Sequence, residues 1–323
     1  MEASDPRPLS FFACPFLPLP GENGKEDEME YRVFADRVAE KLSREMGESY
    51  EVRLTDVIKN NRVTLLGVVI LGEQENVSPT IYLEHFYEQY QKGEDLDGIV
   101  RKILDIYRTK AVPVHLDMDF FQDYEKVKKK IYHRLVHYRM NEEQLAAQPH
   151  IRWNDLAITF YYAMEEKTLG RATITITNQH LEMWGIDKEE LYRTAQENMR
   201  DSRPELLVSM KDLLEEMMRE QLSEQYQVPM YVLTNQEKMY GASALLYSEK
   251  IGELADKLHS DLLILPSSVH EVLLIPDGKE QDYEFFRNMV GEVNSSQVEP
   301  EEVLSGSLYR YVRDHEKIEE IVS

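Results

Sequence analysis

Residues 259–278 have the sequence HSDLLILPSSVHEVLLIPDG and contain two of the most apolar runs in the chain. Each run consists of Leu, Ile and Val, is too short for a helix, and is bounded by Pro, Ser or Asp-Gly, which is typical of a β-strand. Leu262 to Leu265 do not alternate with polar residues, so we expect both faces of this strand to be covered. The stretch therefore predicts a hairpin in the middle of a sheet.

Outward from this hairpin, pairs of predicted strands alternate with amphipathic helices. Further strands are expected at 50–57, 62–71, 155–164, 171–177, 230–234 and 242–247. Helices are expected over 31–42, after Ser78, after Asp95, over 124–139, after Asp187, over 206–218, after Ser248, over 283–293, and from Arg310 onward. Strand pairs joined by short turns and flanked by helices predict an α+β fold, with mainly antiparallel sheet built from successive hairpins.

The length of 323 residues is about twice that of a typical domain, which predicts one large domain or two lobes. Residues 1–28 contain five of the 13 prolines and an acidic run, a composition that predicts a flexible tail. Met29 is an alternative start of the natural chain. After the tail we expect an N-terminal α+β lobe at 29–147 and a C-terminal α+β lobe at 148–323.

Charge and cysteine content limit the partners and the compartment. With 37 Lys and Arg against 60 Asp and Glu, the formal net charge is −23, which opposes binding to nucleic acid or to an anionic membrane surface. The single cysteine, Cys14, excludes an internal disulfide framework and favours a reducing compartment. No apolar run is long enough to span a bilayer. We therefore expect a cytoplasmic protein with no membrane partner; the oligomeric state stays open.

The turn of the central hairpin places a nucleophile, a base and an acid within five residues, namely Ser267, Ser268, His270 and Glu271. Those residue types predict a hydrolase site, but side chains alternate along an extended chain, so Glu271 cannot orient His270. No strand-to-helix nucleophile elbow surrounds the serines. The favoured interpretation is a polar turn whose hydroxyls satisfy backbone amides, with His270 and Glu271 at the sheet rim. A hydrolase site and a ligand or partner rim that includes Asn294 are the alternatives.

The predicted helix at 124–139 carries the only dense basic cluster of this acidic chain, formed by Lys126, Lys128, Lys129, Lys130 and Arg134. His133 and His137 are four residues apart, the helical spacing of two metal-ligating imidazoles, but the surrounding cations oppose metal binding. We interpret the cluster as a solvated basic face, and as a functional surface we expect it to dock an acidic partner or the protein's own acidic surface. Polyanion binding is the alternative.

Metal and nucleotide motifs are weak elsewhere. His115, Asp117 and Asp119 alternate and would share one face of an extended segment, but two carboxylates without further ligands specify little. A helix-capping Asp119 and a solvated loop are the favoured interpretation. Neither G-x-G-x-x-G nor G-K-[ST] occurs, so no nucleotide site of the usual kinds is predicted. We expect no cofactor and no metal site.

Several segments together resemble a bacterial family known as domain of unknown function 5688. They are NRVTLLGVVI at 61–70, PTIYLEHFYEQY at 79–90, NDLAITFYY at 154–162, LEMWGIDKEELYRTAQEN at 181–198, LLILPSSVHEVLLIP at 262–276 and MVGEVNSSQVEPEEVLS at 289–305. The pattern WG-x-x-x-EEL followed by A-x-x-N is also distantly similar to the YtpQ-like family. The resemblance implies a cytoplasmic bacterial protein of one shared architecture, with no established activity to transfer. Residues 1–28 depart from that pattern.

We therefore expect a non-enzymatic protein-interaction module that holds a protein partner through its acidic surface and the basic cluster. The expectation depends on the weakness of the nucleophile, metal and nucleotide signals in a chain long enough to contain such sites. A hydrolase with a site near Ser267–Glu271 and polyanion binding through residues 126–139 are the alternatives.

Overall fold

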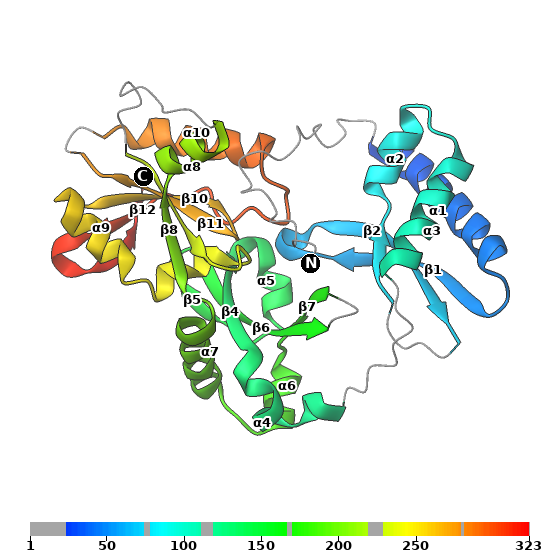
Figure 1. Cartoon of the computed structure of the whole chain (residues 1–323), viewed down its shortest axis with the longest axis horizontal. Helices are drawn as coiled ribbons and strands as arrows, with labels where there is room; N and C mark the ends of the chain where they lie inside the picture. The colour runs from blue at the N-terminus through cyan, green and yellow to red at the C-terminus, as the bar shows by residue number, and fades with distance from the viewer. Residues whose placement is uncertain are drawn as a thin grey trace. The chain divides into compact units, whose positions relative to one another are not determined.

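The computed structural model describes residues 24–73, 78–110, 119–166, 170–218, 229–278 and 281–322 (Figure 1). They form two compact units: an N-terminal unit of the described residues from Gly24 to Phe121 together with Met164–Ala172, and a C-terminal unit of Gln122–Ala163 and Thr173–Ser323. The division near residue 121 precedes the lobe boundary expected at 147, because a strand at 131–137 pairs within the C-terminal unit. The predicted tail lies outside the described residues up to residue 23, and helix α1 begins at Gly24.

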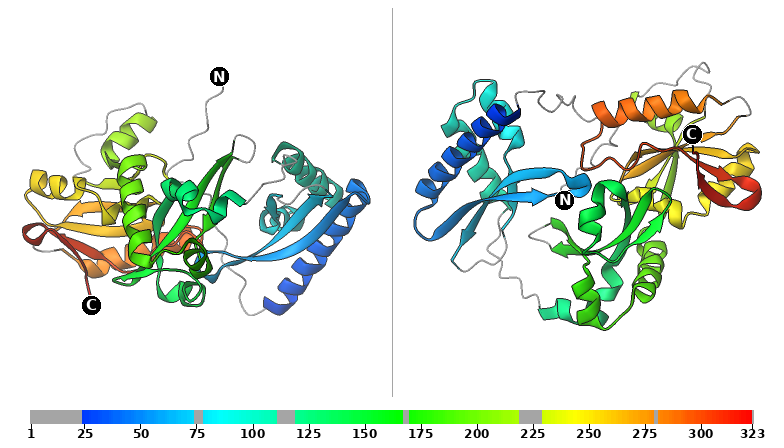
Figure 2. Two further views of the ribbon diagram at one scale, coloured as in Figure 1. Left: turned by 90° about the horizontal axis from the view of Figure 1, so that it is seen from below. Right: turned by 180° about the vertical axis from the view of Figure 1, so that it is seen from behind.

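The N-terminal unit contains an antiparallel sheet of order β1-β2-β3, with bounds Tyr50–Ile58, Thr64–Gly72 and Thr80–Tyr82. Helices α1 (Gly24–Met46), α2 (Glu84–Gln91) and α3 (Leu96–Lys110) pack on one face of it (Figure 2). Alternate β2 residues Leu66, Val68 and Ile70 are buried against these helices. The expected turn between the first two strands is confirmed, with Asn61 in the left-handed region at a φ of 59°. A helix capped by Ser78 is wrong, because β3 intervenes and α2 begins only at Glu84.

The C-terminal unit contains a six-stranded antiparallel sheet of order β13-β12-β10-β11-β9-β8. The expected central hairpin is confirmed: β10 (Leu262–Ser268) pairs with β11 (Glu271–Pro276), and every residue of β10 is buried. The remaining strands are β8 (Glu205–Ser209), β9 (Tyr231–Asn235), β12 (Tyr309–Val312) and β13 (Lys317–Glu320). A strand without a polar face needs cover on both faces of the sheet, and helices on the two faces supply it.

Helices cover the two faces of this sheet. Residues of α8 (Met210–Met218) and α10 (Tyr283–Ser296) pack with Leu263, Leu265 and Ile275 of the hairpin in one core cluster. Helix α9 (Lys250–Leu258) lies on the other side (Figure 1), and the 3-10 helix η6 (Gly241–Leu246) follows β9. The hairpin is therefore the middle layer of a three-layer arrangement.

A second sheet lies mainly in the C-terminal unit and is built on β6 (Leu156–Glu166), which pairs with β4 (Ile131–His137), β5 (Ile151–Trp153) and β7 (Gly170–Thr175). Helix α7 (Lys188–Ser202) packs on β4. Its expected cap is confirmed, since the Asp187 carboxylate accepts a hydrogen bond from the Glu190 amide at 2.8 Å. The 3-10 helix η3 (Asp119–Gln122) spans the point of the chain where the two units divide. The shorter helices of the C-terminal unit are α4 (Tyr124–Val127), η4 (Lys128–Lys130), η5 (Arg139–Asn141), α5 (Glu142–Leu145), α6 (Asn178–Trp184) and η7 (Arg313–His315).

The expected helix over 124–139 is wrong. It ends after two short turns, α4 and η4, and the chain continues as strand β4. The Asn198 side-chain amide of α7 donates hydrogen bonds to the carbonyls of Lys128 (2.6 Å) and Ile131 (2.7 Å). Because those carbonyls are occupied from another element, the turn ends where a regular helix would need them.

Three other expected elements are also wrong. Residues 206–209 belong to strand β8, so α8 begins only at Met210, and the expected strand at 242–247 is the 3-10 helix η6. The expected helix after Arg310 is the β12–β13 hairpin, in which Tyr309 and Tyr311 are buried. Short apolar runs are compatible with both a helix and a strand. Residues 206–209 are a strand because they pair with β9, and residues 309–312 are a strand because they pair with β10. The fold class holds: the protein is α+β with antiparallel sheets.

A buried carboxylate links β11, β12 and α10 at one end of the six-stranded sheet. The Asp277 side chain is 0% exposed and accepts from the Arg310 guanidinium and, at 3.0 Å, from the Tyr283 hydroxyl. Arg310 also donates to that hydroxyl at 2.8 Å. Asp277, Tyr283 and Arg310 thus satisfy one another's charges and hydrogen-bonding groups at the edge of the core.

Replacing Asp277 by asparagine should lower the free energy of unfolding by about 1–2 kcal/mol, because Arg310 loses its buried counter-ion. Urea unfolding of the variant measures this loss. Asp314→Asn is the control, since Asp314 is exposed and its replacement should leave stability unchanged. Equal stability of wild type and Asp277→Asn would contradict the assigned ion pair.

Candidate functional site

The turn of the central hairpin is mostly buried. Ser267, Ser268 and Glu271 are 6%, 0% and 3% exposed. The Ser268 hydroxyl accepts a hydrogen bond from the His270 amide at 3.1 Å, as the polar-turn interpretation expects. The rim position expected for Glu271 is wrong, because its side chain lies within the sheet core. The turn therefore does not present a serine hydroxyl to solvent.

Both imidazole nitrogens of His270 face other groups. Its Nδ1 accepts a hydrogen bond from the Tyr240 amide at 3.1 Å, which places the imidazole proton on Nε2. That nitrogen lies 3.3 Å from a carboxylate oxygen of Glu302. The acid that orients His270 is thus distant in sequence, and no local pattern indicates it. Asn294, expected at the same rim, donates instead to the Ser305 carbonyl at 2.9 Å.

A layered stack joins this turn to the second sheet of the unit. The Tyr240 ring stacks on His270 with centroids 5.6 Å apart and an interplanar angle of 15°. The Arg134 guanidinium lies 4.9 Å from the centroid of the Tyr240 ring and donates to its hydroxyl at 3.0 Å. Arg134 therefore belongs to a packed interior contact and is separate from the lysines with which the sequence groups it.

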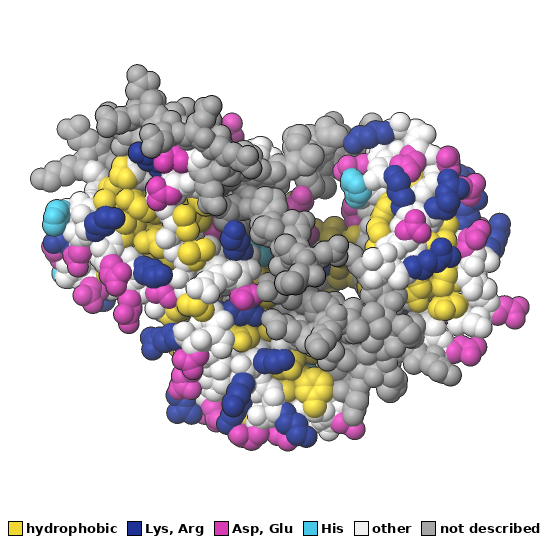
Figure 3. Space-filling view, in the orientation of Figure 1, with side chains coloured by type: hydrophobic (Ala, Val, Ile, Leu, Met, Phe, Trp, Pro, Cys, Tyr) yellow, Lys and Arg dark blue, Asp and Glu magenta, His cyan; other side chains and the backbone are white. Residues whose placement is uncertain are grey.

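The remaining basic cluster is divided by acidic neighbours. Lys126 and Lys128 pair with Asp123 (3.6 Å) and Glu125 (2.6 Å). Lys129 and Lys130 are exposed in the short turn η4. On the face that Figure 3 shows, Lys and Arg side chains are interspersed with Asp and Glu side chains. The cluster thus lacks the continuous basic stripe that polyanion binding uses.

The histidine and aspartate candidates for metal binding do not gather. His133 lies in the core of the C-terminal unit at 0% exposure, on strand β4, and burial lowers its pKa to about 3. Desolvation also lowers the pKa of the half-buried His137, against the opposing effect of Asp155. His115 and Asp117 lie outside the described residues, and Asp119 begins η3. Among the described side chains, no three His, Cys, Asp or Glu residues are grouped to hold a metal ion.

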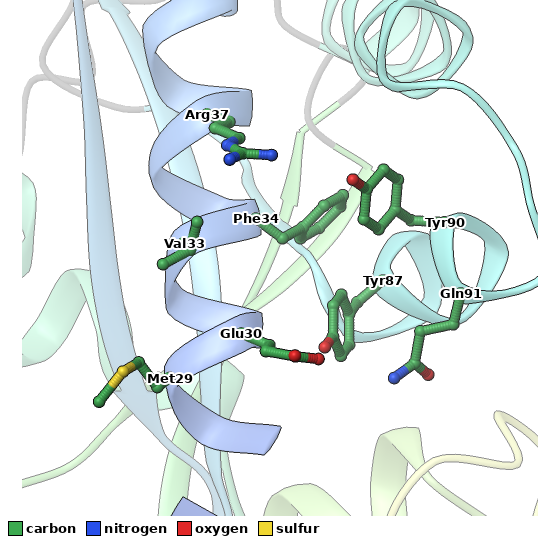
Figure 4. A pocket seen from close by; sticks show the side chains of 8 residues that line it. All are labelled: Met29, Glu30, Val33, Phe34, Arg37, Tyr87, Tyr90 and Gln91. Carbon is green, nitrogen blue, oxygen red and sulfur yellow. The ribbon is translucent and has the colours of Figure 1, made fainter. Parts of the chain in front are cut away.

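The N-terminal unit has an aromatic groove between α1 and α2, a feature that the sequence analysis missed (Figure 4). Its floor is formed by Phe34 of α1, whose ring lies 5.2 Å from Tyr87 and 5.1 Å from Tyr90 of α2. Tyr31, which does not line the groove, packs with its ring centroid 4.9 Å from that of Tyr87. We call this feature the α1–α2 groove; it is lined by Met29, Glu30, Val33, Phe34, Arg37, Tyr87, Tyr90 and Gln91.

The groove exposes apolar surface that a helix of a folded unit normally buries. Met29 is 69% exposed, Val33 44% and Tyr90 37%. Its volume is about 570 Å³, and Glu30, Arg37 and Gln91 add the few polar groups. Peptide and small-molecule sites share this composition, an apolar wall with few polar groups. A sequence signal exists: Met29 and Val33 widen the apolar side of α1 beyond the stripe that its core needs.

A family model described as "Family of unknown function (DUF5688)" matches residues 31–313. The chain belongs to this family. The match covers residues of both units, so the His270 stack and the groove residues from Val33 onward lie within the matched span, whereas Met29 and Glu30 precede it. Neither the curated proteins nor the solved structures contain a match. None of the described helices of this DUF5688 member combines the length and apolar character that crossing a membrane requires.

Proposed function

We propose that this protein is a non-enzymatic, cytoplasmic protein-interaction module that binds an extended apolar peptide of a partner in the α1–α2 groove. The observation that carries the proposal is the exposure of the groove wall: Met29, Val33 and Tyr90 leave apolar surface in contact with solvent. Exposed apolar patches with a polar rim are typical of interaction sites. The single cysteine and the net charge of −23 support the proposed location and a partner that is not a polyanion.

The chemistry of the groove indicates the kind of peptide. Three of its lining side chains are aromatic, namely Phe34, Tyr87 and Tyr90, and aromatic walls favour proline and large aliphatic side chains in an extended backbone. Tyr90 is partly exposed and carries a hydroxyl, so it can pack on a ligand and donate a hydrogen bond to a peptide carbonyl. Glu30 and Arg37, of opposite sign, stand one on either side of Val33 along α1 and can set the direction of the peptide.

The proposal places the binding site in the α1–α2 groove, whereas the sequence analysis pointed to the basic cluster at 126–134 and to the hairpin turn at 267–271. Arg134 is packed inside the C-terminal unit, and both nitrogens of His270 are engaged, which supports neither polyanion binding nor nucleophilic catalysis at those residues. Catalysis through Ser268 would need its hydroxyl to contact an imidazole nitrogen, whereas it accepts from a backbone amide.

The test is selection of phage-displayed random 12-residue peptides on the full chain, followed by fluorescence titration of the most enriched peptide. Replacing Tyr90 by alanine should weaken its binding about tenfold or more, as removal of an aromatic anchor does. Tyr50→Ala is the matched control, because Tyr50 is also 37% exposed but lies on β1, outside the groove. Equal loss of affinity in both variants, or none in Tyr90→Ala, would contradict the proposal.

A further inference from the structure

We propose that the C-terminal unit binds a small tetrahedral oxyanion, a phosphate group, between the guanidinium group of Arg134 and the hydroxyl of Tyr161. Arg134 of β4 lies opposite Thr159 of β6 in the second sheet. Two residues away on each strand, Tyr132 lies opposite Tyr161. Because side chains alternate along a strand, these four side chains share one face of the sheet. The site is in a different unit from the α1–α2 groove, and it does not rest on the proposed function.

Arg134 carries a positive charge that no carboxylate offsets. Its Nε, Nη1 and Nη2 atoms donate to the neutral hydroxyls of Thr159 (3.4 Å), Tyr240 (3.0 Å) and Thr175 (3.4 Å). Among the described residues Arg134 forms no ion pair, although the chain has a net charge of −23. A partly buried cation without a counter-ion is unfavourable, so a bound anion would stabilise it.

The surroundings of Arg134 are rich in hydrogen-bond donors and poor in acceptors. The guanidinium group has more N–H donors than its three hydrogen bonds use. The three hydroxyls that accept from it each keep a proton, and none of them donates to a described residue. The Tyr161 hydroxyl adds a further donor, because its residue is 0% exposed and its oxygen has no hydrogen-bond partner among the described residues. An oxyanion, which only accepts, satisfies donors of this kind.

Two guanidinium groups act on the Tyr161 hydroxyl. Burial raises its pKa above the ordinary value, and the positive charges of Arg203 and Arg134 oppose that rise. The phenol therefore stays protonated at neutral pH and can donate. The guanidinium carbon of Arg203 lies 4.6 Å from the centroid of the Tyr132 ring, and its buried Nη1 atom is 3.7 Å from a carboxylate oxygen of Glu237. Arg203 thus adds positive potential beside Tyr161, of which Glu237 offsets a part.

Tyr240 holds one side of the site in place. Its ring lies 5.0 Å from the Tyr161 ring and stacks on His270, while its hydroxyl accepts from Arg134. Its backbone is in the left-handed region at a φ of 54°, and its amide donates to His270 Nδ1 at 3.1 Å. A non-glycine residue adopts this conformation only where its surroundings hold it there. The donors are therefore fixed before an anion binds, which reduces the ordering that binding requires.

The arrangement suits one small oxyanion and not a polyanion. The donors come from β4, β6, β7 and the residue before η6, so they are spread around Arg134 and form no row along a surface. A nucleic acid presents phosphates in series and is bound by many basic side chains. Arg134, Thr175 and Tyr240 are each partly exposed, so a small ion can reach them from solvent.

Calorimetric titration of the full chain with sodium phosphate, at constant ionic strength, tests the site. We expect saturable binding with a dissociation constant of about 1 mM or less. Tyr161→Phe removes only a hydroxyl that has no partner, so urea unfolding should not change. Phosphate should nevertheless bind this variant about tenfold more weakly, because a hydrogen bond to a charged group is lost. Thr175→Val, on a partly exposed residue, should also weaken binding.

Tyr124→Phe is the matched control, since its partly buried hydroxyl contacts Thr194 in the same unit, outside the site. It should bind phosphate as the wild type does. Titration with methyl phosphate distinguishes the source of the group: equal binding indicates a phosphate ester, and binding of phosphate alone indicates the free ion. Absence of saturable binding of either ion would overturn the inference. Unchanged affinity in Tyr161→Phe and Thr175→Val, or an equal loss in Tyr124→Phe, would overturn it too.

Discussion

Replacing Gly241 by alanine is expected to lower the free energy of unfolding by about 3 kcal/mol or more. A Cβ atom at this position would lie 2.1 Å from the Thr234 hydroxyl, 2.5 Å from the His270 carbonyl oxygen and 2.7 Å from the Asn235 amide nitrogen. Two of these atoms are backbone, so no side-chain rotation relieves the overlap. The Thr234 hydroxyl also donates to the His270 carbonyl at 2.8 Å, and the methyl group would break that contact.

Urea unfolding of the C-terminal unit in the intact chain measures the effect. Gly291→Ala is the matched control, because Gly291 lies within α10 and its Cβ would meet nothing within 4 Å. That change should raise stability by about 0.5–1 kcal/mol through helix propensity. If Gly241→Ala unfolds at the same urea concentration as the wild type, η6 does not pack against the hairpin turn as described.

The second large effect concerns acid stability and His133. The His133 ring is 0% exposed, lies 6.2 Å from Tyr192 and 6.0 Å from Tyr247, and has no hydrogen-bond partner for either nitrogen among the described residues. Burial lowers its pKa to about 3 from an ordinary 6.5. Between these values the unfolded chain binds a proton that the folded chain does not, so stability is full above pH 6.5 and falls as pH decreases toward 3.

Replacing His133 by leucine should therefore remove part of the acid sensitivity. Between pH 6.5 and 4.5 the loss of unfolding free energy should be about 2–3 kcal/mol smaller in His133→Leu than in the wild type. At pH 7 the variant should be at least as stable as the wild type, because two unpaired polar atoms leave the core. The control is His85→Leu on α2 of the other unit. The same pH dependence in His133→Leu and the wild type would contradict a neutral, buried His133.

Much of the fold follows from local sequence patterns. The run Leu262–Leu265 lacks a polar face, and only a central strand hides both of its sides, so its position in the sheet was predictable. The caps at Asp95 and Asp187 were predictable for a similar reason, because a carboxylate before a helix satisfies its first amides. Such signals lie within a few residues of the element that they determine.

Each wrongly predicted helix has a cause that is distant in the sequence. Residues 124–139 have a helical period, but Asn198 takes the carbonyls of Lys128 and Ile131, and β6 pairs with the residues that follow. Residues 206–209 and 309–312 are equally compatible with either period until β9 and β10 pair with them. The partner strand is remote in sequence, and no periodicity within the segment contains that information.

The candidate site was the least predictable part. The sequence identifies Ser268 and His270 by residue type, but the contact of Nε2 is with Glu302, and Arg134 reaches the same stack from a different sheet. The α1–α2 groove was missed for a different reason, which lies in the local pattern itself. The apolar stripes that contain Phe34 in α1 and Tyr87 in α2 each predict a core, and the exposure of Met29 and Val33 in the structure shows that the stripe of α1 is wider than the core that it covers.

Photo-crosslinking from the groove tests the central claim most directly. With benzophenylalanine in place of Val33, the peptide obtained by phage selection should become covalently attached under illumination, and mass spectrometry should place the link at position 33. Benzophenylalanine in place of Ile58, an exposed apolar residue of β1 at 63%, should give no attachment. Attachment at position 33 alone is the result that we predict. Equal attachment at both positions, or none at position 33, would contradict a peptide site between α1 and α2.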